Sequence, residues 1–329
     1  MSAFVLENRK QTGNSFINEN GHKLHFRVEW ANFSTAKYVL FYIPGYSGHI
    51  NGPSFLKMSA HMNKHMCVVI GVDMQGHGYS EGERCLMTNH EHMMNDFIQL
   101  VSSLQHEDKA HELTFDQSEG SFSPQYLPDI RKLPFFIMGS SMGGALCTIT
   151  AHQLQSQREE YPQFKGAILL APALSFKTAN WLLIETLRYT VGTCTPSSQM
   201  PQFLSNLNDN TLTFRTAEGL AYAAADSWGS SPEALGWNQG MRWGTALMFI
   251  DFAAALQKIM PEVAYPFLII HDPLDQVCNI EGGRNLMEQS QTSPDKKKLI
   301  EAHGFLHGVL VNETEACCNY ALKWMDEMI

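Results

Sequence analysis

The sequence predicts an α/β protein, in which helices cover both faces of a mostly parallel central sheet and a largely helical cap is inserted into the sheet domain. Short continuous apolar runs, typical of strands buried on both faces, recur between Gly, Pro and Asp residues. Segments with helical spacing, such as 92–105 and 144–157, alternate with these runs, as they do in parallel sheets with crossover helices. The predicted strands are Leu24–Trp30, Tyr38–Ile43, Cys67–Val72, Phe135–Met138, Ala167–Leu170, Phe267–Ile270 and Lys298–Ala302.

Two segments interrupt this alternation. Residues 173–243 lie between two predicted strands and are far longer than a crossover helix requires. They contain apolar pieces separated by a Pro, Ser and Asn-rich piece, so we expect them to form the cap. Residues 1–172 and 244–329 then form the core domain. The polar segment 107–131 is expected to be a long surface loop.

Composition narrows the class of protein. A formal charge of −10 argues against nucleic-acid binding, which requires a concentrated basic face. The basic run Lys296–Lys298 is expected to be a solvated strand entry. The seven cysteines contain no Cys-x-x-Cys pair, so we expect all of them to be reduced, as is usual in the cytoplasm.

Localisation signals are also informative. The first twelve residues lack the pattern of a secretory signal, and no apolar run approaches the roughly 20 residues that span a bilayer. We therefore expect a cytoplasmic protein that is soluble or peripheral at membranes.

A Gly-x-Ser-x-Gly pattern, which can present a serine nucleophile on a strained strand-to-helix turn, occurs twice, at 139–143 and 78–82. Ser141 follows an apolar strand and precedes small residues and a helical run. Ser80 leads into polar residues without a helix start. Ser141 is therefore predicted to be the nucleophile, and Ser80 to lie in a loop.

A serine nucleophile needs a histidine base, and the base needs an orienting carboxylate. In folds with this turn the chain order is Ser, then Asp or Glu, then His, each at a strand end. The strand ending near residue 270 leads to Asp272 and Asp275, and the last strand leads to His303 and His307. Strand-end position alone leaves both pairs open.

The chain resembles the monoacylglycerol lipase/lysophospholipase-like α/β-hydrolases, a group commonly described with the serine aminopeptidases. Residues 73–82 resemble the family pattern Asp-x-x-Gly-His-Gly-x-Ser-x-Gly, and residues 139–144 resemble Gly-His-Ser-Met-Gly-Gly. Residues 242–245 look like the exit from the family's cap. The likeness covers nearly the whole chain and implies the α/β-hydrolase fold.

The resemblance also selects among the open alternatives. The family pattern His-Gly-x-x-Asp ends on Asp275, and the pattern Lys-Leu-x-x-x-Pro-Gly-x-x-His ends on His307. It thus implies a catalytic triad of Ser141, Asp275 and His307. Asp272, which stands where the family usually has Gly, would be a turn residue, and His303 a solvent-facing loop residue.

An oxyanion hole requires two backbone N–H groups. One should belong to Met142, which follows the nucleophile, and the resemblance of residues 43–49 to His-Gly-x-x-x-His implies Tyr46 for the other. Pro44 replaces the usual first His of this loop, and Ser140 replaces the His before the nucleophile. Neither position transfers a proton, so the chemistry should survive while the pocket wall and substrate preference change.

These features favour a serine hydrolase that cleaves carboxylic esters through an acyl-enzyme intermediate, with monoacylglycerol or lysophospholipid esters as substrates. The apolar segment 181–187 suits acyl-chain entry and transient membrane-surface contact, although the packing of a cap helix explains it nearly as well. We expect a small-molecule or lipid ester substrate, no nucleic-acid partner, no cofactor and no metal, since no His or Cys pattern suits zinc.

Three alternatives stay open. One is a carboxylesterase for small substrates. Another is an aminopeptidase, whose cap would hold a substrate ammonium group through an acidic residue such as Glu185, Glu218 or Asp226. The third is a non-catalytic binding protein on a hydrolase scaffold, which should lack a triad member. Dehalogenases and epoxide hydrolases use an Asp nucleophile, so Ser141 argues against both.

Overall fold

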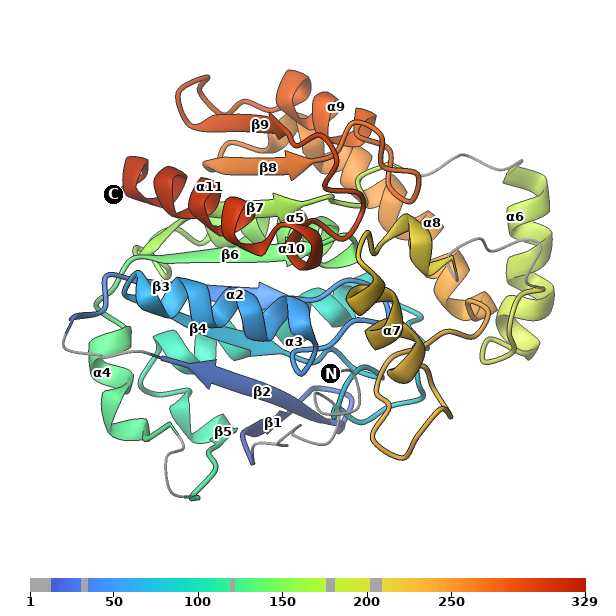
Figure 1. The fold of residues 1–329 in the computed structure, drawn as a ribbon, viewed down its shortest axis with the longest axis horizontal. Coiled ribbons are helices and arrows are strands. Elements are labelled where there is room, and N and C mark those ends of the chain that lie inside the picture. Colours follow the sequence, from blue (N-terminus) through green and yellow to red (C-terminus); the bar gives the residue numbers. More distant parts are fainter. Residues whose placement is uncertain (1–12, 31–34, 119–121, 176–180, 202–208) are drawn as a thin grey trace.

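The computed structural model describes residues 13–30, 35–118, 122–175, 181–201 and 209–329, and the side chains of 181–183 lie outside the described part. Its centre is a nine-stranded sheet in the order β5-β1-β2-β4-β3-β6-β7-β8-β9 (Figure 1). From β4 to β9 all neighbours are parallel, whereas β5, β1 and β2 join by antiparallel pairing. The strands are β1 (Ser15–Ile17), β2 (Lys23–Glu29), β3 (Tyr38–Ile43), β4 (Cys67–Val72), β5 (Leu113–Thr114), β6 (Phe135–Ser140), β7 (Phe164–Leu170), β8 (Phe267–His271) and β9 (Lys297–Glu301).

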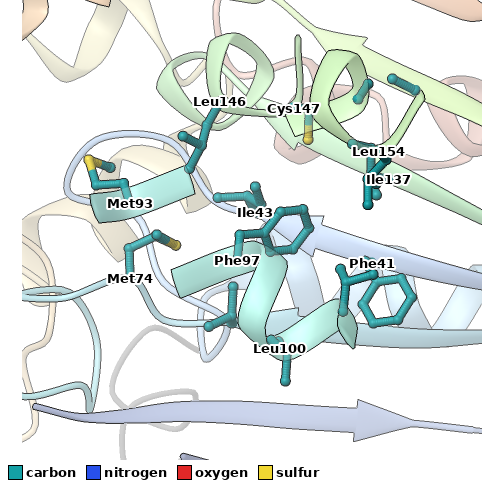
Figure 2. Close-up of a cluster of buried hydrophobic side chains, with 14 of the residues drawn as sticks. Phe41, Ile43, Met74, Met93, Phe97, Leu100, Ile137, Leu146, Cys147 and Leu154 are labelled. Carbon is teal, nitrogen blue, oxygen red and sulfur yellow. The ribbon is translucent and has the colours of Figure 1, made fainter. Parts of the chain in front are cut away.

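The central strands are apolar throughout because helices cover both of their faces. Along β3, Val39, Phe41 and Ile43 enter one core cluster, and Tyr38, Leu40 and Tyr42 enter the other. Successive side chains of a strand point to opposite faces, so this alternation builds two cores from one strand. Figure 2 shows part of the first cluster, where side chains of the sheet meet those of α3 and α5.

The helices form two layers around the sheet (Figure 1). One face is covered by α2, α10 and α11, and the other by α3, α5, α8 and α9. Their bounds are α2 (Pro53–Lys64), α3 (His90–Gln105), α4 (Leu127–Ile130), α5 (Met142–Ser156), α6 (Trp181–Leu187), α7 (Ala217–Ala225), α8 (Trp243–Ile259), α9 (Glu281–Gln289), α10 (Val309–Asn312) and α11 (Thr314–Glu327). This arrangement confirms the predicted α/β class, and all seven predicted strands are present.

Residues 173–243 connect β7 to α8 and include α6 and α7. Both helices lie beyond the carboxyl ends of the parallel strands (Figure 1). The far end of this segment is bonded to the core, because the Arg242 guanidinium donates to the Arg84 carbonyl at 2.7 Å and pairs with Glu83 at 2.8 Å. The buried Thr245 hydroxyl then donates to the Cys85 carbonyl at 2.8 Å. Residues 242–245 are thus bonded to the 83–85 loop.

The segment 107–131 differs from the expected long surface loop. It contains β5, two 3-10 turns and α4. Its scattered apolar residues explain the difference, since Leu113, Leu127 and Ile130 are buried in the first core cluster. β5 also pairs with β1, a three-residue strand that the sequence pattern did not indicate.

The two edges of the sheet differ in length. β5 closes one edge with two residues, whereas β9 forms the other edge with five. The outward positions of β9 are charged, since Lys298 and Glu301 are exposed. The basic run predicted as a solvated strand entry therefore continues into an edge strand.

All seven cysteines are free thiols, and six of them are buried. Within the described residues, no helix is both long and apolar enough to cross a membrane.

Candidate active site

Ser141 occupies the sharp turn between β6 and α5. Its backbone has φ +54° and ψ −117°, in the left-handed half of conformational space that side chains rarely adopt. The turn is held in place because the Ser141 N–H donates to the Leu170 carbonyl at 2.8 Å. The Ser141 side chain thereby projects at the carboxyl end of the sheet and at the amino end of α5.

The glycines around Ser141 are required by close packing. A Cβ atom on Gly139 would lie 2.1 Å from the Gly143 carbonyl oxygen, and one on Gly143 would lie 2.3 Å from the Ile43 carbonyl oxygen. Both distances are far shorter than a real contact. The second Gly-x-Ser-x-Gly match, at residues 78–82, has different surroundings.

Ser80 in that second match is a buried structural residue. Its hydroxyl donates to the Asp73 carbonyl and accepts the His25 N–H at 2.8 Å. The Asp73 carboxylate in turn accepts the N–H groups of Ile50 at 2.8 Å and Tyr79 at 3.0 Å. The loop is thus organised around a buried carboxylate and leads into no helix.

Asp275 and His307 meet at the ends of β8 and β9. Asp275 Oδ2 lies 2.8 Å from His307 Nδ1 and 3.1 Å from His271 Nε2. Its other oxygen accepts the N–H groups of Val277 at 2.8 Å and Cys278 at 3.1 Å. With Nδ1–H pointing at the carboxylate, His307 Nε2 is left with its lone pair.

Charge at Asp275 follows from these contacts. Burial acts to raise its pKa, but the hydrogen bonds from His271 and His307 outweigh burial and hold the pKa well below its usual range. Asp275 is therefore ionised at neutral pH, the form that orients an imidazole and stabilises an imidazolium.

The two alternative residues have different surroundings. The His303 side chain is exposed. Asp272 is fully buried, and its carboxylate accepts the Leu274 N–H at 2.9 Å and the Leu306 N–H at 2.8 Å. Asp272 is thus a turn residue of the acid loop that also reaches the loop carrying His307, a contact that the sequence pattern did not indicate.

The nucleophile and base are not bonded to each other in this structure. Among the described residues no hydrogen bond joins Ser141 to His307, and the Ser141 hydroxyl instead lies 3.8 Å from the Cys278 thiol. Catalytic hydrogen bonds are often long without substrate and tighten in the complex. Burial raises the pKa of Cys278 to about 12, so this neighbour is an uncharged thiol. In the sequence, only the position of Cys278, three residues after Asp275, indicated that it could lie near the site.

The expected oxyanion donors flank Ser141. A Cβ on Gly45 would lie 3.1 Å from the Ser141 Cβ, so the 43–46 loop packs directly on the nucleophile turn. The Tyr46 backbone follows immediately, and Met142 is the first residue of α5. Within the described part of the chain neither of their N–H groups donates a hydrogen bond. Met142 thus follows Ser141 directly, and Tyr46 belongs to the loop that packs on the same turn.

Ser140, which departs from the family pattern, and Tyr46, in the neighbouring loop, both contact aromatic side chains. The Ser140 hydroxyl, where the family usually has His, lies 3.1 Å from the Tyr42 hydroxyl. The Tyr46 ring packs against Phe249 and His77, with centroids 6.0 Å and 6.3 Å apart. Burial lowers the pKa of His77 to about 4, so this histidine is neutral and packs as a structural residue.

Two segments between β7 and α8 reach the loops of the site. The Leu212 and Thr213 carbonyls accept the backbone N–H groups of His307 at 3.4 Å and Gly308 at 3.2 Å. Near α7, Asp226 Oδ2 lies 2.7 Å from His49 Nε2, and both residues are buried. The segment between β7 and α8 therefore contacts both the loop that carries His307 and the loop that carries Tyr46.

Metal ligands do not gather near these residues. Across the ranges that the structure describes, no group of three or more His, Cys, Asp or Glu side chains is arranged to hold a metal ion.

A mostly parallel sheet with a serine on a strained strand-to-helix turn, followed by an Asp and a His on later strand-end loops, defines the α/β-hydrolase fold. Residues 34–315 match the family described as "Serine aminopeptidase, S33", and the chain belongs to this family of hydrolases.

Relatives and solved structures agree with this assignment. The monoglyceride lipase of Mus musculus is 25% identical over 320 residues, which cover 95% of this chain and 90% of the relative. The Homo sapiens monoglyceride lipase is 23% identical over 94% of this chain and 89% of its own. A soluble variant of the Saccharomyces cerevisiae monoglyceride lipase, solved with a substrate analogue, superposes with a TM-score of 0.67 at 18% identity, covering 97% and 95% of the two chains. The monoacylglycerol lipase of Paleococcus ferrophilus gives a TM-score of 0.64 at 17% identity, covering 92% and 99%.

Proposed function

We propose that this protein is a serine hydrolase that cleaves carboxylic esters through an acyl-enzyme intermediate. The observation that carries the proposal is the 2.8 Å contact between Asp275 and His307, at the same end of the sheet as the strained turn of Ser141. The contact leaves His307 Nε2 free to accept a proton, and a serine needs such a base.

The proposed reaction has two halves. Ser141 Oγ attacks the ester carbonyl carbon while its proton passes to His307 Nε2, and the resulting oxyanion accepts the N–H groups of Tyr46 and Met142. The intermediate collapses, and the alcohol leaves with the proton from His307. A water molecule then attacks the carbonyl carbon of the acyl-enzyme and gives its proton to His307. His307 returns the proton to Ser141 Oγ as the carboxylic acid leaves, which restores Ser141.

We propose monoacylglycerol or lysophospholipid esters as substrates. The similarity to monoglyceride lipases over most of the chain supports this class. Residues 173–243 would act as the cap and residues 1–172 and 244–329 as the core. The apolar helix α6 would line the acyl entrance and contact a membrane surface transiently, which would suit a cytoplasmic enzyme peripheral at membranes. The side chains of 181–183, on which this role partly depends, lie outside the described residues.

The aminopeptidase alternative has less support in the cap. Of its three acidic candidates, Asp226 is engaged by His49 at 2.7 Å and by Tyr222 at 2.8 Å, and Glu185 is 3.4 Å from the Arg188 guanidinium. Glu218 is exposed on the first turn of α7. A substrate ammonium would therefore have to displace existing partners or bind an exposed carboxylate, which contributes little.

The nucleophile can be tested by labelling with a fluorophosphonate. Wild-type protein should be labelled, and Ser141→Ala should abolish both labelling and ester hydrolysis. Ser80→Ala is the matched control, because Ser80 sits in the same residue pattern but is bonded to Asp73 and His25. Labelling that survives in Ser141→Ala and vanishes in Ser80→Ala would reject the assignment.

The substrate class can be tested with p-nitrophenyl esters from acetate to decanoate, kept below micelle-forming concentrations, beside aminoacyl anilides. Each methylene buried in an apolar channel should contribute up to about 0.8 kcal/mol, nearly fourfold in kcat/KM. A rise toward medium chains supports the lipid ester class. A preference for acetate would indicate a small-substrate carboxylesterase, and cleavage of anilides alone would indicate a peptidase. Absence of all turnover and labelling would indicate a non-catalytic binding protein.

A further inference from the structure

The buried carboxylate of Asp272 joins the acid loop to the base loop. One of its oxygens, Oδ1, accepts the Leu274 N–H at 2.9 Å and closes a local turn. The other, Oδ2, crosses to the last strand-end loop and accepts the Leu306 N–H at 2.8 Å. The side chain is fully buried, so a carboxylate here is costly unless hydrogen bonds replace those it would make with water.

The partner of Oδ2 is a strained residue. Leu306 has φ +54°, in the left-handed region that disfavours a residue with a branched side chain and favours glycine. A leucine keeps this conformation only when its surroundings hold it there. Its N–H is held by Asp272, and the next residue in the chain is His307, whose Nδ1 lies 2.8 Å from Asp275.

We propose that Asp272 is a positioning residue that fixes the backbone of Leu306 in its left-handed conformation and thereby sets the imidazole of His307 between Asp275 and Ser141. The inference rests on the proposed serine-hydrolase function. Asp272 touches no reacting atom, and it acts only through the peptide that precedes the base. The resemblance places glycine at this position in the family, so this contact is a feature of this chain's own sequence.

The two oxygens of Asp272 make the proposal separable from a purely structural role. A turn residue would act through Oδ1 and the Leu274 N–H alone, and its loss would lower stability without affecting the base. The proposed role acts through Oδ2 and the Leu306 N–H. Its loss should therefore lower kcat and leave KM unchanged, because the substrate-binding surface is intact while the base is misplaced.

The first test is Asp272→Gly, measured for ester hydrolysis and for the hydrogen-bonded Nδ1–H proton of His307 in the downfield NMR spectrum. That proton is assigned by its loss in His307→Ala. We expect kcat to fall about 10- to 100-fold at unchanged KM, and the proton signal to broaden or shift. A variant that loses thermal stability but keeps both kcat and the proton signal would overturn the proposal.

The second test adds Leu306→Gly, which allows the left-handed backbone without a holding contact. Leu306→Gly alone should lower kcat less than Asp272→Gly does, because the Asp272 contact with the backbone remains, and the double variant should recover most of the kcat lost in Asp272→Gly. A double variant as slow as Asp272→Gly would show that the effect does not pass through Leu306. If wild-type protein hydrolyses no ester, the proposed function fails, whereas the His307 proton signal in the variants still decides the role of Asp272.

Discussion

Two residues of the site occupy backbone conformations that normally suit glycine. Ser141 and Leu306 both have φ +54°, and a left-handed conformation costs roughly 1–2 kcal/mol for a residue with a Cβ atom. Such strain persists where the fold over-determines the position, and it concentrates at functional sites. The turn around Ser141 is held by β6, α5 and the Leu170 carbonyl, and the turn around Leu306 by Asp272.

The base and acid assignments predict a specific ranking of variants. His307→Ala should lower kcat at least about a thousandfold, and Asp275→Asn should lower it about 10⁴-fold, because each disrupts proton transfer from Ser141. His303→Ala should stay within about threefold, since that side chain is exposed. Steady-state kinetics on one ester measures all three. Comparable kcat/KM for wild type and His307→Ala would refute the assignment.

Another prediction concerns Asp96, a buried carboxyl on α3 outside the site. Burial raises its pKa to about 7, although nearby Asn18 acts in the opposite direction. Its pKa is about 3.8 in the unfolded chain, so the unfolded state ionises first and the native state loses stability as the pH rises from about 4 to 7. Above that window the loss is complete, on the order of 4 kcal/mol.

Asp96→Asn removes this penalty. Its stability advantage over wild type should therefore increase between pH 5 and pH 8, by on the order of 2 kcal/mol in urea unfolding. Asp129→Asn, an exposed carboxyl on α4, is the control and should show no comparable gain. An advantage of Asp96→Asn that shrinks as the pH rises would contradict the prediction.

Residue patterns indicated which residues could form the site, but they did not indicate how those residues are connected. The strand-to-helix context distinguished Ser141 from Ser80, and chain order brought the choice of acid and base down to two residues each. The contacts of Asp272 with Leu306 and of Cys278 with Ser141 depend on how separate loops fold back on one another. For the contact with Leu306, the available signal was Asp272 itself, an acidic residue where the family usually has glycine.

At the scale of elements, the end of α7 is joined to the 43–49 loop by a buried polar cluster around Asp226. Its carboxylate lies 2.7 Å from His49, accepts the Tyr222 hydroxyl at 2.8 Å and accepts the Leu235 N–H at 2.8 Å. His49 Nδ1 also accepts the Asn51 N–H at 3.2 Å, which leaves Nε2–H to donate to Asp226. The cluster links α7 to the loop that carries Tyr46.

Asp226→Ala should therefore destabilise the protein by about 1–3 kcal/mol for each polar group left unpaired, because it leaves His49 and the Leu235 N–H buried without their partner. Urea unfolding measures the loss, and a double-mutant cycle with His49→Ala isolates the pair. Glu218→Ala, an exposed acidic change on the same helix, should alter stability by less than about 0.5 kcal/mol. Additive losses in the cycle would show that the two side chains are not coupled.

Elements with strong periodicity were predictable, and short ones were not. The seven apolar strand runs and the helices α3 and α5 were found near their observed positions. β1 and β5 have three and two residues, too few for an alternation pattern to register. Segment 107–131 looked like a loop because its buried residues are isolated among polar ones, and only the packing of the whole sheet brings them into the core.

The whole molecule carries a formal charge of −10, yet one edge of its sheet begins with a basic run. β9 has an open row of backbone groups along its outer side, and Lys298 and Glu301 are exposed on it. Charged side chains on an edge strand oppose pairing with the edge of another molecule.

Lys298→Val should thus leave stability within about 0.5 kcal/mol and raise the aggregation rate several-fold, because it extends the apolar pair Leu299–Ile300 along the edge. Light scattering at matched protein concentration and matched unfolded fraction measures this. Lys57→Val, an exposed lysine on α2, is the control for loss of one positive charge. Equal scattering by the two variants would rule out an edge-specific effect.

The charged edge has a consequence for how the protein tolerates crowding. Wherever copies of the protein meet at high local density, an unprotected edge strand would let their sheets pair edge to edge into insoluble assemblies. With β5 too short to template a neighbour and with Lys298 and Glu301 exposed on β9, neither edge favours such growth. We therefore expect the lysines before and within β9 to oppose aggregation. This role is separate from the candidate active site, which lies at the carboxyl ends of the strands.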